Sequence, residues 1–357
     1  MVVSREGASS DVFGVRSLTP AAPRVSAAEV ERIAAEHYGL TGVTATQLSS
    51  EMDENFRLDG PRGRHLLKLV PADEQPEITD LVTNALSHVA RVAPDLAVQE
   101  IVPSLDGALS KRCATLSGNQ RTVRVTSFLE GRVLRSVESS TALRERLGRT
   151  LAQLGQALRD FRHPNVHRDL SWDLRHAGRM QRMLDDVPDF DRGGVLRASL
   201  AHFDERIVPR LDRLRAQPVH NDLSIDNAVI DDTGEIGVID FGDVVHTQLV
   251  NDLAIAAADQ LSLEDDPLAP ALDVARGYHE VEPLVPGELE LLYELIRMRV
   301  VQRIIGGEWR SSRVPENREY LGRNLTRLWA ILERLPATGA EDATGRVFAT
   351  CRWSNLP

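Results

Sequence analysis

Two stretches of the chain carry nearly the same phrase and could do the same chemistry. Residues 166–175 read "VHRDLSWDLR" and residues 219–228 read "VHNDLSIDNA". Each offers a carboxylate, Asp169 or Asp222, that could accept the proton of an attacking hydroxyl. Transfer of phosphate from magnesium-bound ATP needs such a carboxylate, a metal ligand close to it and a second metal-binding carboxylate further along the chain.

The spacing within each phrase separates the two. In the catalytic loop of protein kinases, a metal-binding Asn stands five residues after the base. Five residues after Asp222 is Asn227, whose amide oxygen can bind Mg²⁺. Five residues after Asp169 is Leu174, which has no metal-binding atom. The second phrase is therefore the one predicted to do chemistry.

The second metal-binding carboxylate is predicted at Asp240. This residue ends the apolar run "GEIGVID" and precedes Phe241 and Gly242, so a strand would present it beside a Gly that leaves room for phosphate. The similar segment after the first phrase, "PDFDRGG" with Asp189, follows a helical run instead. We predict a catalytic site of Asp222, Asn227 and Asp240, in which Asn227 and Asp240 are the metal ligands.

Both phrases also have simpler interpretations. The second could be an Asn- and Asp-rich turn between a helix and a hairpin, but three matching elements in the right order favour a site. His220 is expected to hold the loop backbone rather than to transfer protons. In the first phrase, Trp172 is expected to pack and the charges to be solvated; the alternative is that Trp172 or residues 167–169 line an acceptor pocket.

The elements around these motifs change character along the chain. A helix is predicted from Ser26 to near Gly39, and an amphipathic helix over 76–92. Strand-like runs accompany them, and a hairpin follows the second phrase. The strand-like runs are 43–49, 55–59, 64–70, 97–104, 108–116 and 122–131, and the later helical runs are 143–158, 196–214, 251–262, 269–282, 287–305 and 316–334.

This order predicts a β-rich N-terminal lobe followed by a helical lobe with a small hairpin inside it. We predict a nucleotide-binding lobe over 26–130 and a catalytic and substrate-binding lobe over 131–335. Residues 1–25 lack periodicity and are predicted to be a flexible arm. Residues 336–357 form a tail that could dock as a strand or stay mobile.

Composition limits the classes of partner. The 357 residues include 42 basic and 53 acidic side chains, a net charge of −11, which argues against binding to nucleic acid or anionic membranes and suits a small cationic partner. Cys113 and Cys351 are far apart, so neither a disulfide framework nor a zinc site is indicated. With no long apolar run and no secretory signal pattern, we expect a cytoplasmic protein. Oligomeric state is not predicted.

The motifs resemble those of the aminoglycoside phosphotransferase and choline kinase superfamily over roughly residues 40–330. "VHNDLSIDNAVI" and "GVIDFGD" resemble its catalytic and metal motifs, and "HLLKLV" its phosphate-binding strand. "SSEMDENFRL" and "LSWDLRHA" resemble segments of the hydroxylysine kinase-like branch. The resemblance implies an α+β, bilobal, protein-kinase-like fold, with a small β-rich N-terminal lobe and a larger helical C-terminal lobe.

The resemblance also implies a nucleotide site. Lys68 would bind the α- and β-phosphates, and the turn near Asn55 would cover them. The family pairs this Lys with an acidic residue on the next helix, but the register places Val82 there, so Glu77 or Asp80 would substitute. The backbone of the "TSFLEG" connector would bind adenine, with three residues nearest: Ser127, Phe128 and Leu129.

The hypothesis is transfer of the ATP γ-phosphoryl group, with Mg²⁺, to a hydroxyl of a small cationic acceptor such as 5-hydroxylysine or another amino alcohol. Candidate acceptor-binding residues are Asp226, Asp243, Asp252 and Trp172. An aminoglycoside or peptide antibiotic is the alternative acceptor. A pseudokinase is disfavoured because the catalytic groups are present. A protein kinase is disfavoured because the sequence has neither the Gly-rich phosphate loop nor the Ala-Pro-Glu segment after Asp-Phe-Gly that protein kinases carry.

Overall fold

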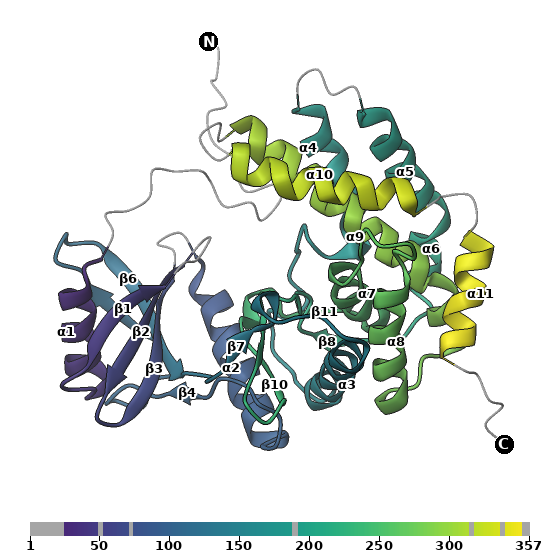
Figure 1. Ribbon diagram of the computed structural model, residues 1–357. Coiled ribbons are helices and arrows are strands. Elements are labelled where there is room, and N and C mark those ends of the chain that lie inside the picture. The colour runs from purple at the N-terminus through teal and green to yellow at the C-terminus, as the bar shows by residue number, and fades with distance from the viewer. Residues whose placement is uncertain are drawn as a thin grey trace, which may run out of the picture.

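The computed structural model describes residues 25–48, 53–70, 74–187, 192–313, 318–335 and 340–351 (Figure 1). Parts of four sequence predictions fall outside these residues: all of the N-terminal arm except Val25, residues 49–52 of the phosphate-covering turn, Asp189, and residues 336–339 and 352–357 of the tail. No helix of the described residues is long and apolar enough to cross a membrane.

The N-terminal part is built on an antiparallel sheet covered on its outer side by one helix. Strand order is β1-β2-β3-β6-β4, with β5 paired to β6. The covering helix, α1 (Ala27–Tyr38), begins where Ser26 accepts the Glu29 N–H (3.3 Å) and ends at Gly39 in the left-handed region, as predicted. The strands are β1 (Thr44–Leu48), β2 (Glu54–Gly60), β3 (Gly63–Leu69), β4 (Ile101–Val102), β5 (Lys111–Ala114) and β6 (Gln120–Ser127).

The helix α2 (Pro76–Val92) matches its predicted range and lies between the sheet and the helical part (Figure 1). Its apolar stripe, which includes Leu81, Ala85 and Val89, belongs to the large core of the C-terminal part, whereas the sheet and α1 form a second, smaller core. The element that follows the Lys68 strand is thus packed against the lobe that carries the catalytic loop.

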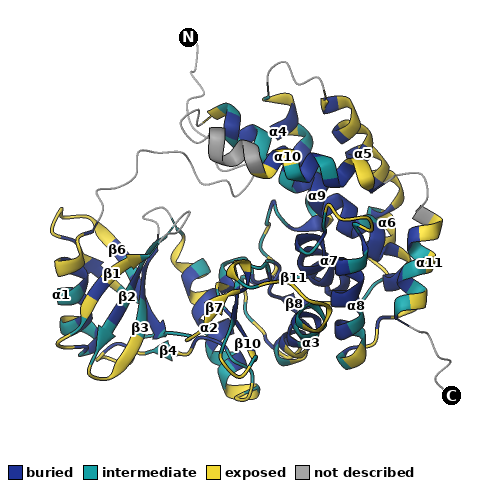
Figure 2. Ribbon diagram, in the orientation of Figure 1, coloured by how far each residue is buried: buried dark blue, intermediate teal, exposed yellow. Residues whose placement is uncertain are grey.

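The C-terminal part is mainly helical, and two of its helices are in especially close contact. A Cβ on Gly148 would lie 2.1 Å from the Val274 carbonyl oxygen, so the backbones of α3 and α8 touch there. α7 is buried along its whole length (Figure 2). The helices are α3 (Thr141–Leu158), α4 (Gln181–Asp185), α5 (Gly193–Arg206), α6 (Val208–Leu211), α7 (Leu249–Asp259), α8 (Ala269–Val281), α9 (Pro286–Arg313), α10 (Arg318–Arg334) and α11 (Ala340–Thr350).

Two small sheets position the catalytic motifs within this helical part. The predicted hairpin is β9 (Ala228–Ile230) with β10 (Ile236–Val238), extended by β7 (Arg132–Val133). The other sheet pairs β8 (Ala216–Val219) with β11 (Val245–Gln248). β8 leads directly into the second phrase, and β10 ends two residues before Asp240.

The prediction of an α+β fold with a β-rich part followed by a helical part is confirmed, and three details are corrected. The sequence analysis missed β8 and β11. Pro209 divides the predicted helix over 196–214 into α5 and α6, since a Pro inside a helix removes a backbone donor. Within the tail, residues 340–351 form a helix rather than a strand: Ala343, Val347 and Cys351 recur every four residues and pack as one buried face of α11.

Candidate active site

The loop that follows β8, which begins at His220, is fixed by hydrogen bonds to a side chain of α7. His220 and Asn221 are fully buried, and Asn221 adopts φ +64°, a left-handed conformation that Asn tolerates better than most residues. The Asp252 carboxylate of α7 accepts the Asn221 N–H (2.7 Å) and the His220 N–H (3.3 Å). The prediction that Asp252 binds the acceptor is therefore wrong, because its side chain is buried beneath the loop backbone.

The environment of Asp252 sets its charge. Burial raises its pKa to about 7, while the hydrogen bonds that it accepts from two backbone N–H groups favour the ionised form. The neighbouring His220 is structural, as predicted: its Nδ1 accepts the Asp222 N–H (3.3 Å), and its Nε2 donates to the Ile239 carbonyl (3.2 Å). Burial lowers the pKa of His220 to about 4, so it stays neutral at pH 7.

The Asp222 carboxylate is oriented by two side chains. Its Oδ2 accepts from the Asn227 amide nitrogen (2.8 Å) and its Oδ1 from Arg299 Nη2 (3.1 Å). The same Asn227 nitrogen also donates to the Asp222 carbonyl (2.9 Å). Because the nitrogen is used within the loop, the amide oxygen of Asn227 is the atom left for a metal ion.

The proton affinity of Asp222 is raised. Burial and the neighbouring carboxylate of Asp243 raise its pKa, and the Arg299 guanidinium opposes them. Its side chain remains 32% exposed, so it is open to a substrate. A carboxylate with a raised pKa, held in a fixed orientation and partly exposed, has the properties of a general base.

Asp240 carries the second predicted metal-binding carboxylate. It adopts φ +61°, and its Oδ1 accepts the Gly242 N–H (3.2 Å) and contacts Lys68 Nζ (3.3 Å). Burial alone would raise its pKa, but Lys68 and Arg124 overcome this effect and hold the pKa at about 2. Its side chain is 45% exposed, so an ionised carboxylate is accessible to a ligand.

Lys68 has different partners from those predicted. Its Nζ contacts Asp53 Oδ2 (2.5 Å) as well as Asp240, and its side chain is only 8% exposed. Glu77 lies exposed in the first turn of α2 and makes no ion pair with Lys68, and Asp80 pairs with His163 (2.9 Å). The predicted pairing is therefore corrected: the acidic partner, Asp53, stands just before β2.

A row of polar side chains crosses the sheet at Lys68. The strand register places Asn55 of β2 and Arg124 of β6 directly opposite Lys68, so all three side chains share one face. The Asn55 Oδ1 atom is buried and has no hydrogen-bond partner among the described residues. Arg124, a buried cation that lowers the Asp240 pKa, was not predicted, although its place in the alternating run "TVRVTS" signals it.

The connector between the two parts leaves the backbone N–H of Leu129 open to a ligand. The Ser127 N–H donates to the Glu100 carbonyl (2.8 Å) and the Phe128 N–H to the Arg64 carbonyl (3.2 Å). Within the described residues, the Leu129 N–H makes no hydrogen bond. Of the three connector residues predicted to lie near adenine, Leu129 alone has a backbone N–H available to it.

The first phrase supports the turn that carries Asp240. Arg168 donates from Nε to the Val244 carbonyl (3.1 Å) and from Nη2 to the Gly242 carbonyl. Asp169, the counterpart of Asp222, is instead engaged by Arg179. The first phrase thus supports the turn that carries Asp240 through Arg168, and that no base lies in this phrase stays a prediction.

Trp172 packs against α9. A Cβ on Gly306 would lie 2.5 Å from the indole Cη2, and the Arg310 guanidinium lies 5.5 Å from the ring centroid. The Trp172 carbonyl accepts from Arg299 Nη1 (3.3 Å), and the same guanidinium binds Asp222. Trp172 therefore follows the packing interpretation, and Arg299, which sequence reasoning missed, connects the two phrases.

The remaining acceptor candidates differ in their surroundings. Asp226 is exposed and forms an ion pair with Arg135. Asp243 lies close enough to Asp222 to raise its pKa, and its own pKa is raised by burial against the opposing effect of Arg168. Of these candidates, Asp243 is the one whose charge raises the pKa of the base.

The donor set fits a magnesium ion bound together with phosphates. Among the described residues no group of three or more His, Cys, Asp or Glu side chains could hold a metal ion. Mg²⁺ commonly takes only one or two protein ligands, with phosphate and water oxygens completing its coordination. Asn227 and Asp240 supply that number.

Comparison with known proteins agrees with this geometry. Residues 44–292, which include Lys68, Asp222, Asn227 and Asp240, match the model of the phosphotransferase enzyme family. The chain belongs to this family. It is an enzyme that transfers phosphate to a hydroxyl-bearing small molecule.

The relatives are similar along nearly the whole chain. Hydroxylysine kinase of Mus musculus is 23% identical over 95% of this chain and 96% of its own, and hydroxylysine kinase of Danio rerio is 23% identical over 87% and 93%. Among solved structures, an amicoumacin kinase in complex with AMP-PNP and Ca²⁺ aligns with a TM-score of 0.63 at 16% identity, covering 90% of this chain and 92% of its own. A microcompartment-associated aminopropanol kinase aligns with a TM-score of 0.63 at 17% identity, covering 88% and 98%. The two solved structures show the shared fold.

Proposed function

We propose that this phosphotransferase moves the γ-phosphoryl group of ATP to a hydroxyl of 5-hydroxylysine or a similar amine-bearing amino alcohol. The observation that carries the proposal is the pairing of Lys68 with Asp240 beside the loop of Asp222 and Asn227. This arrangement unites a phosphate-binding cation, two metal ligands and a base. The similarity to hydroxylysine kinases over nearly the whole chain supports the acceptor.

In this mechanism Asp222 accepts the proton of the acceptor hydroxyl as that oxygen forms its bond to the γ-phosphorus. The bond from the γ-phosphorus to the bridging oxygen breaks, and ADP leaves with the electron pair. Lys68 binds the phosphates, and Asn55, with its unused Oδ1, lies on the same face. Asn227 and Asp240 would hold Mg²⁺, which supplies neutralisation of phosphate charge when it is bound.

The acidic groups near Asp222 favour an acceptor that carries an amine. Asp243 raises the pKa of Asp222, and burial raises the pKa of Asp243 itself. A nearby ammonium group would therefore stabilise both carboxylates in their charged forms. The net charge of −11 draws cations toward the molecule in the same sense.

The test is ADP release from ATP by the purified protein with and without Mg²⁺. The acceptor panel holds 5-hydroxylysine, ethanolamine, choline, homoserine, 1-amino-2-propanol and several aminoglycosides. We expect magnesium-dependent turnover stimulated most by 5-hydroxylysine. A preference for an aminoglycoside would contradict the proposed acceptor but not the proposed phosphoryl transfer. Nucleotide binding without turnover on any acceptor would contradict the proposal.

A further inference from the structure

A cavity of about 430 Å³ lies beside the catalytic loop. Its wall is formed by Ile225 of the loop, the turn over 134–139, the start of α3, the end of α7 with the residues that follow it to 264, Pro270 of α8, and Arg327 of α10. Ile225 is three residues beyond Asp222. The cavity is therefore a place where part of an acceptor could lie while its hydroxyl reaches the base.

Most of the charged side chains in this wall already have partners. Asp259 pairs with Arg303 (2.6 Å) and accepts the Ile225 N–H (2.8 Å). Arg144 binds Asp273 through two nitrogens (2.8 and 3.0 Å). Arg135 makes two contacts with the carboxylate of Asp226. These groups neutralise one another and leave little charge for a ligand.

Two charged side chains of opposite sign are left in the wall. Arg327 donates to the Leu261 carbonyl but has no carboxylate within ion-pair distance among the described residues. Glu264 is exposed and likewise makes no ion pair with any described residue. Because the two are also not paired with each other, the wall presents a separated cation and anion.

A third group in the wall lacks a partner. The Gln260 Nε2 atom is buried and makes no hydrogen bond among the described residues. A buried donor without an acceptor destabilises the protein, so a ligand that supplies an acceptor there gains binding free energy. Half-burial lowers the pKa of Arg327, against the effect of Asp259, so an anion placed beside this guanidinium would be favoured as well.

The cavity lies close to the base along α9. Arg299, which binds Asp222, and Arg303, which binds Asp259, are four residues apart on this helix. Four residues advance an α-helix by about 6 Å, so the Asp259 wall is roughly one helical turn from the arginine that holds Asp222.

We propose that this cavity binds the α-amino acid head group of the acceptor. Arg327 and Gln260 receive its carboxylate, Glu264 receives its ammonium group, and the side-chain hydroxyl reaches Asp222. This inference rests on the proposed phosphotransferase function and specifies the acceptor class. It separates an amino acid from amino alcohols and aminoglycosides that lack a carboxylate.

The kinetic test compares 5-hydroxy-L-lysine with 1,5-diamino-2-pentanol, which is the same molecule without its carboxylate. We expect the wild-type enzyme to have a kcat/KM at least tenfold higher for the amino acid. Arg327→Gln should raise the KM for 5-hydroxylysine about 10- to 100-fold, the usual effect of losing a charge-assisted hydrogen bond, and leave the KM for the diamine unchanged. Arg327→Lys, which retains a cation, should fall between.

Arg334→Gln is the matched control. Arg334 lies on the same helix and donates to the Leu263 and Glu264 carbonyls of the same segment, but it does not line the cavity. It should leave the preference for the amino acid intact. An equal rise in KM for both acceptors in Arg327→Gln, or equal use of both by the wild type, would overturn the head-group assignment while leaving the phosphotransferase function in place.

A binding measurement covers the case in which neither acceptor is phosphorylated. Calorimetric titration with L-lysine and with cadaverine reports recognition of the carboxylate without turnover. A preference for L-lysine of tenfold or more that disappears in Arg327→Gln would support the head-group site even if the acceptor hydroxyl were misidentified. Equal binding of both compounds, or binding of neither, would overturn it.

Discussion

Asp222 is the residue on which the proposed chemistry depends, and its neighbours set how strongly it holds a proton. Asn227 and Arg299 orient the two carboxylate oxygens at 2.8 and 3.1 Å. Burial and Asp243 raise its pKa, and Arg299 limits the rise. Arg299 thus combines two effects, orientation of the base and control of its pKa.

Replacing Arg299 should change the pH dependence of catalysis. The base must be ionised, and it loses activity as pH falls through its pKa. Arg299→Met removes the cation that opposes the raised pKa, so the acidic limb of kcat against pH should move to higher pH. The profile of kcat from pH 5 to 9 measures this shift.

Arg297→Met provides the control for that profile. Arg297 is buried on the same helix but donates to the Leu335 carbonyl (3.3 Å) and Ser199 Oγ (3.2 Å), away from Asp222. It should lower stability without moving the limb. An acidic limb that is the same in Arg299→Met and in the wild type would show that Arg299 does not act on the pKa of the base.

The prediction of Asp222, Asn227 and Asp240 rests on residue spacing alone, because the catalytic motif is local in sequence. It could not identify Arg299 or Asp53, because those contacts depend on which way a helix and a strand face after folding. Asp252 was misassigned for the same reason: an acidic residue in an apolar helix can serve a buried backbone as readily as a substrate.

At the scale of elements, the packing of α3 on α8 depends on two glycines. A Cβ on Gly148 would lie 2.1 Å from the Val274 carbonyl oxygen, and one on Gly277 would lie 1.9 Å from the Glu145 carbonyl oxygen. Real side chains cannot be accommodated at such distances. The two helices must therefore separate if either glycine is replaced.

Gly277→Ala should lower the free energy of unfolding by about 1 to 3 kcal/mol, the usual cost of overpacking a close contact. Gly345→Ala is the contrasting variant: it is exposed in α11, its Cβ would meet nothing within 4 Å, and Ala should stabilise the helix by about 1 kcal/mol. Urea denaturation of both variants measures these changes. Equal effects of the two substitutions would contradict the close packing of α3 and α8.

Long periodic elements were predictable and short ones were not. α2 was predicted over its observed range because its 17 residues carry a long, regular stripe of apolar side chains at helical spacing. β8 and β11 have four residues each, and Pro218 within β8 weakens its strand signal. Their pairing arises from the fold around them rather than from their own sequences.

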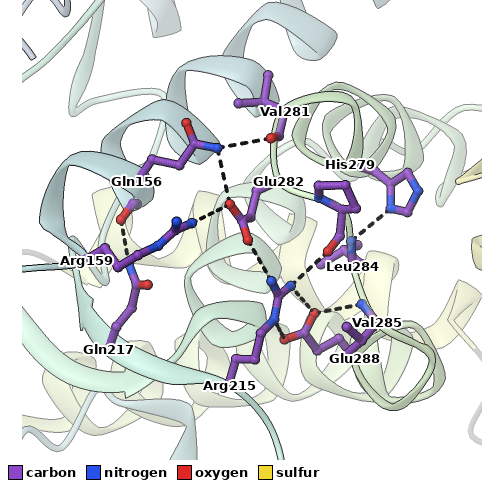
Figure 3. A network of polar contacts seen from close by, with 12 residues as sticks. Gln156, Arg159, Arg215, Gln217, His279, Val281, Glu282, Leu284, Val285 and Glu288 are labelled. Atoms are coloured by element: carbon purple, nitrogen blue, oxygen red, sulfur yellow. Dashed lines mark hydrogen bonds and ion pairs between the residues drawn. The ribbon is translucent and has the colours of Figure 1, made fainter.

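At the scale of the whole molecule, an ionic network built on the buried carboxylates of Glu282 and Glu288 joins segments that are distant in sequence (Figure 3). Arg215, next to β8, binds Glu288 through Nε and Nη2 (2.9 and 2.7 Å) and Glu282 through Nη1 (2.6 Å). Arg159 at the end of α3 also binds Glu282 (2.7 Å). The network fastens the strand before the catalytic loop to the connection between α8 and α9.

Glu288→Ala should lower the free energy of unfolding by about 1 to 3 kcal/mol, because it removes the fully buried carboxylate that accepts two hydrogen bonds from Arg215, and Arg215 keeps only Glu282 as an ionic partner among the described residues. Glu290→Ala removes an exposed ion pair with Arg210 two residues away and should cost less than about 1 kcal/mol. Denaturant midpoints of the two variants test the difference. Comparable losses would show that the Arg215 network contributes little.

The two-part architecture was predictable from the change of periodicity along the chain, and the small-molecule chemistry from the motifs. The cavity beside Ile225 was not, because its walls come from four separate parts of the sequence and its free charges are known only once the other ion pairs are placed. Composition could indicate a cationic partner but not a zwitterionic one.

The most direct test of the account is the kcat of Asp222→Asn with ATP, Mg²⁺ and the best acceptor of the panel, measured together with the ATP dissociation constant. We predict a fall in kcat of about 100- to 10,000-fold, the usual contribution of a general base, with ATP affinity within a few-fold of the wild type. A kcat within tenfold of the wild type would contradict the assignment of Asp222 as the base and with it the proposed active site.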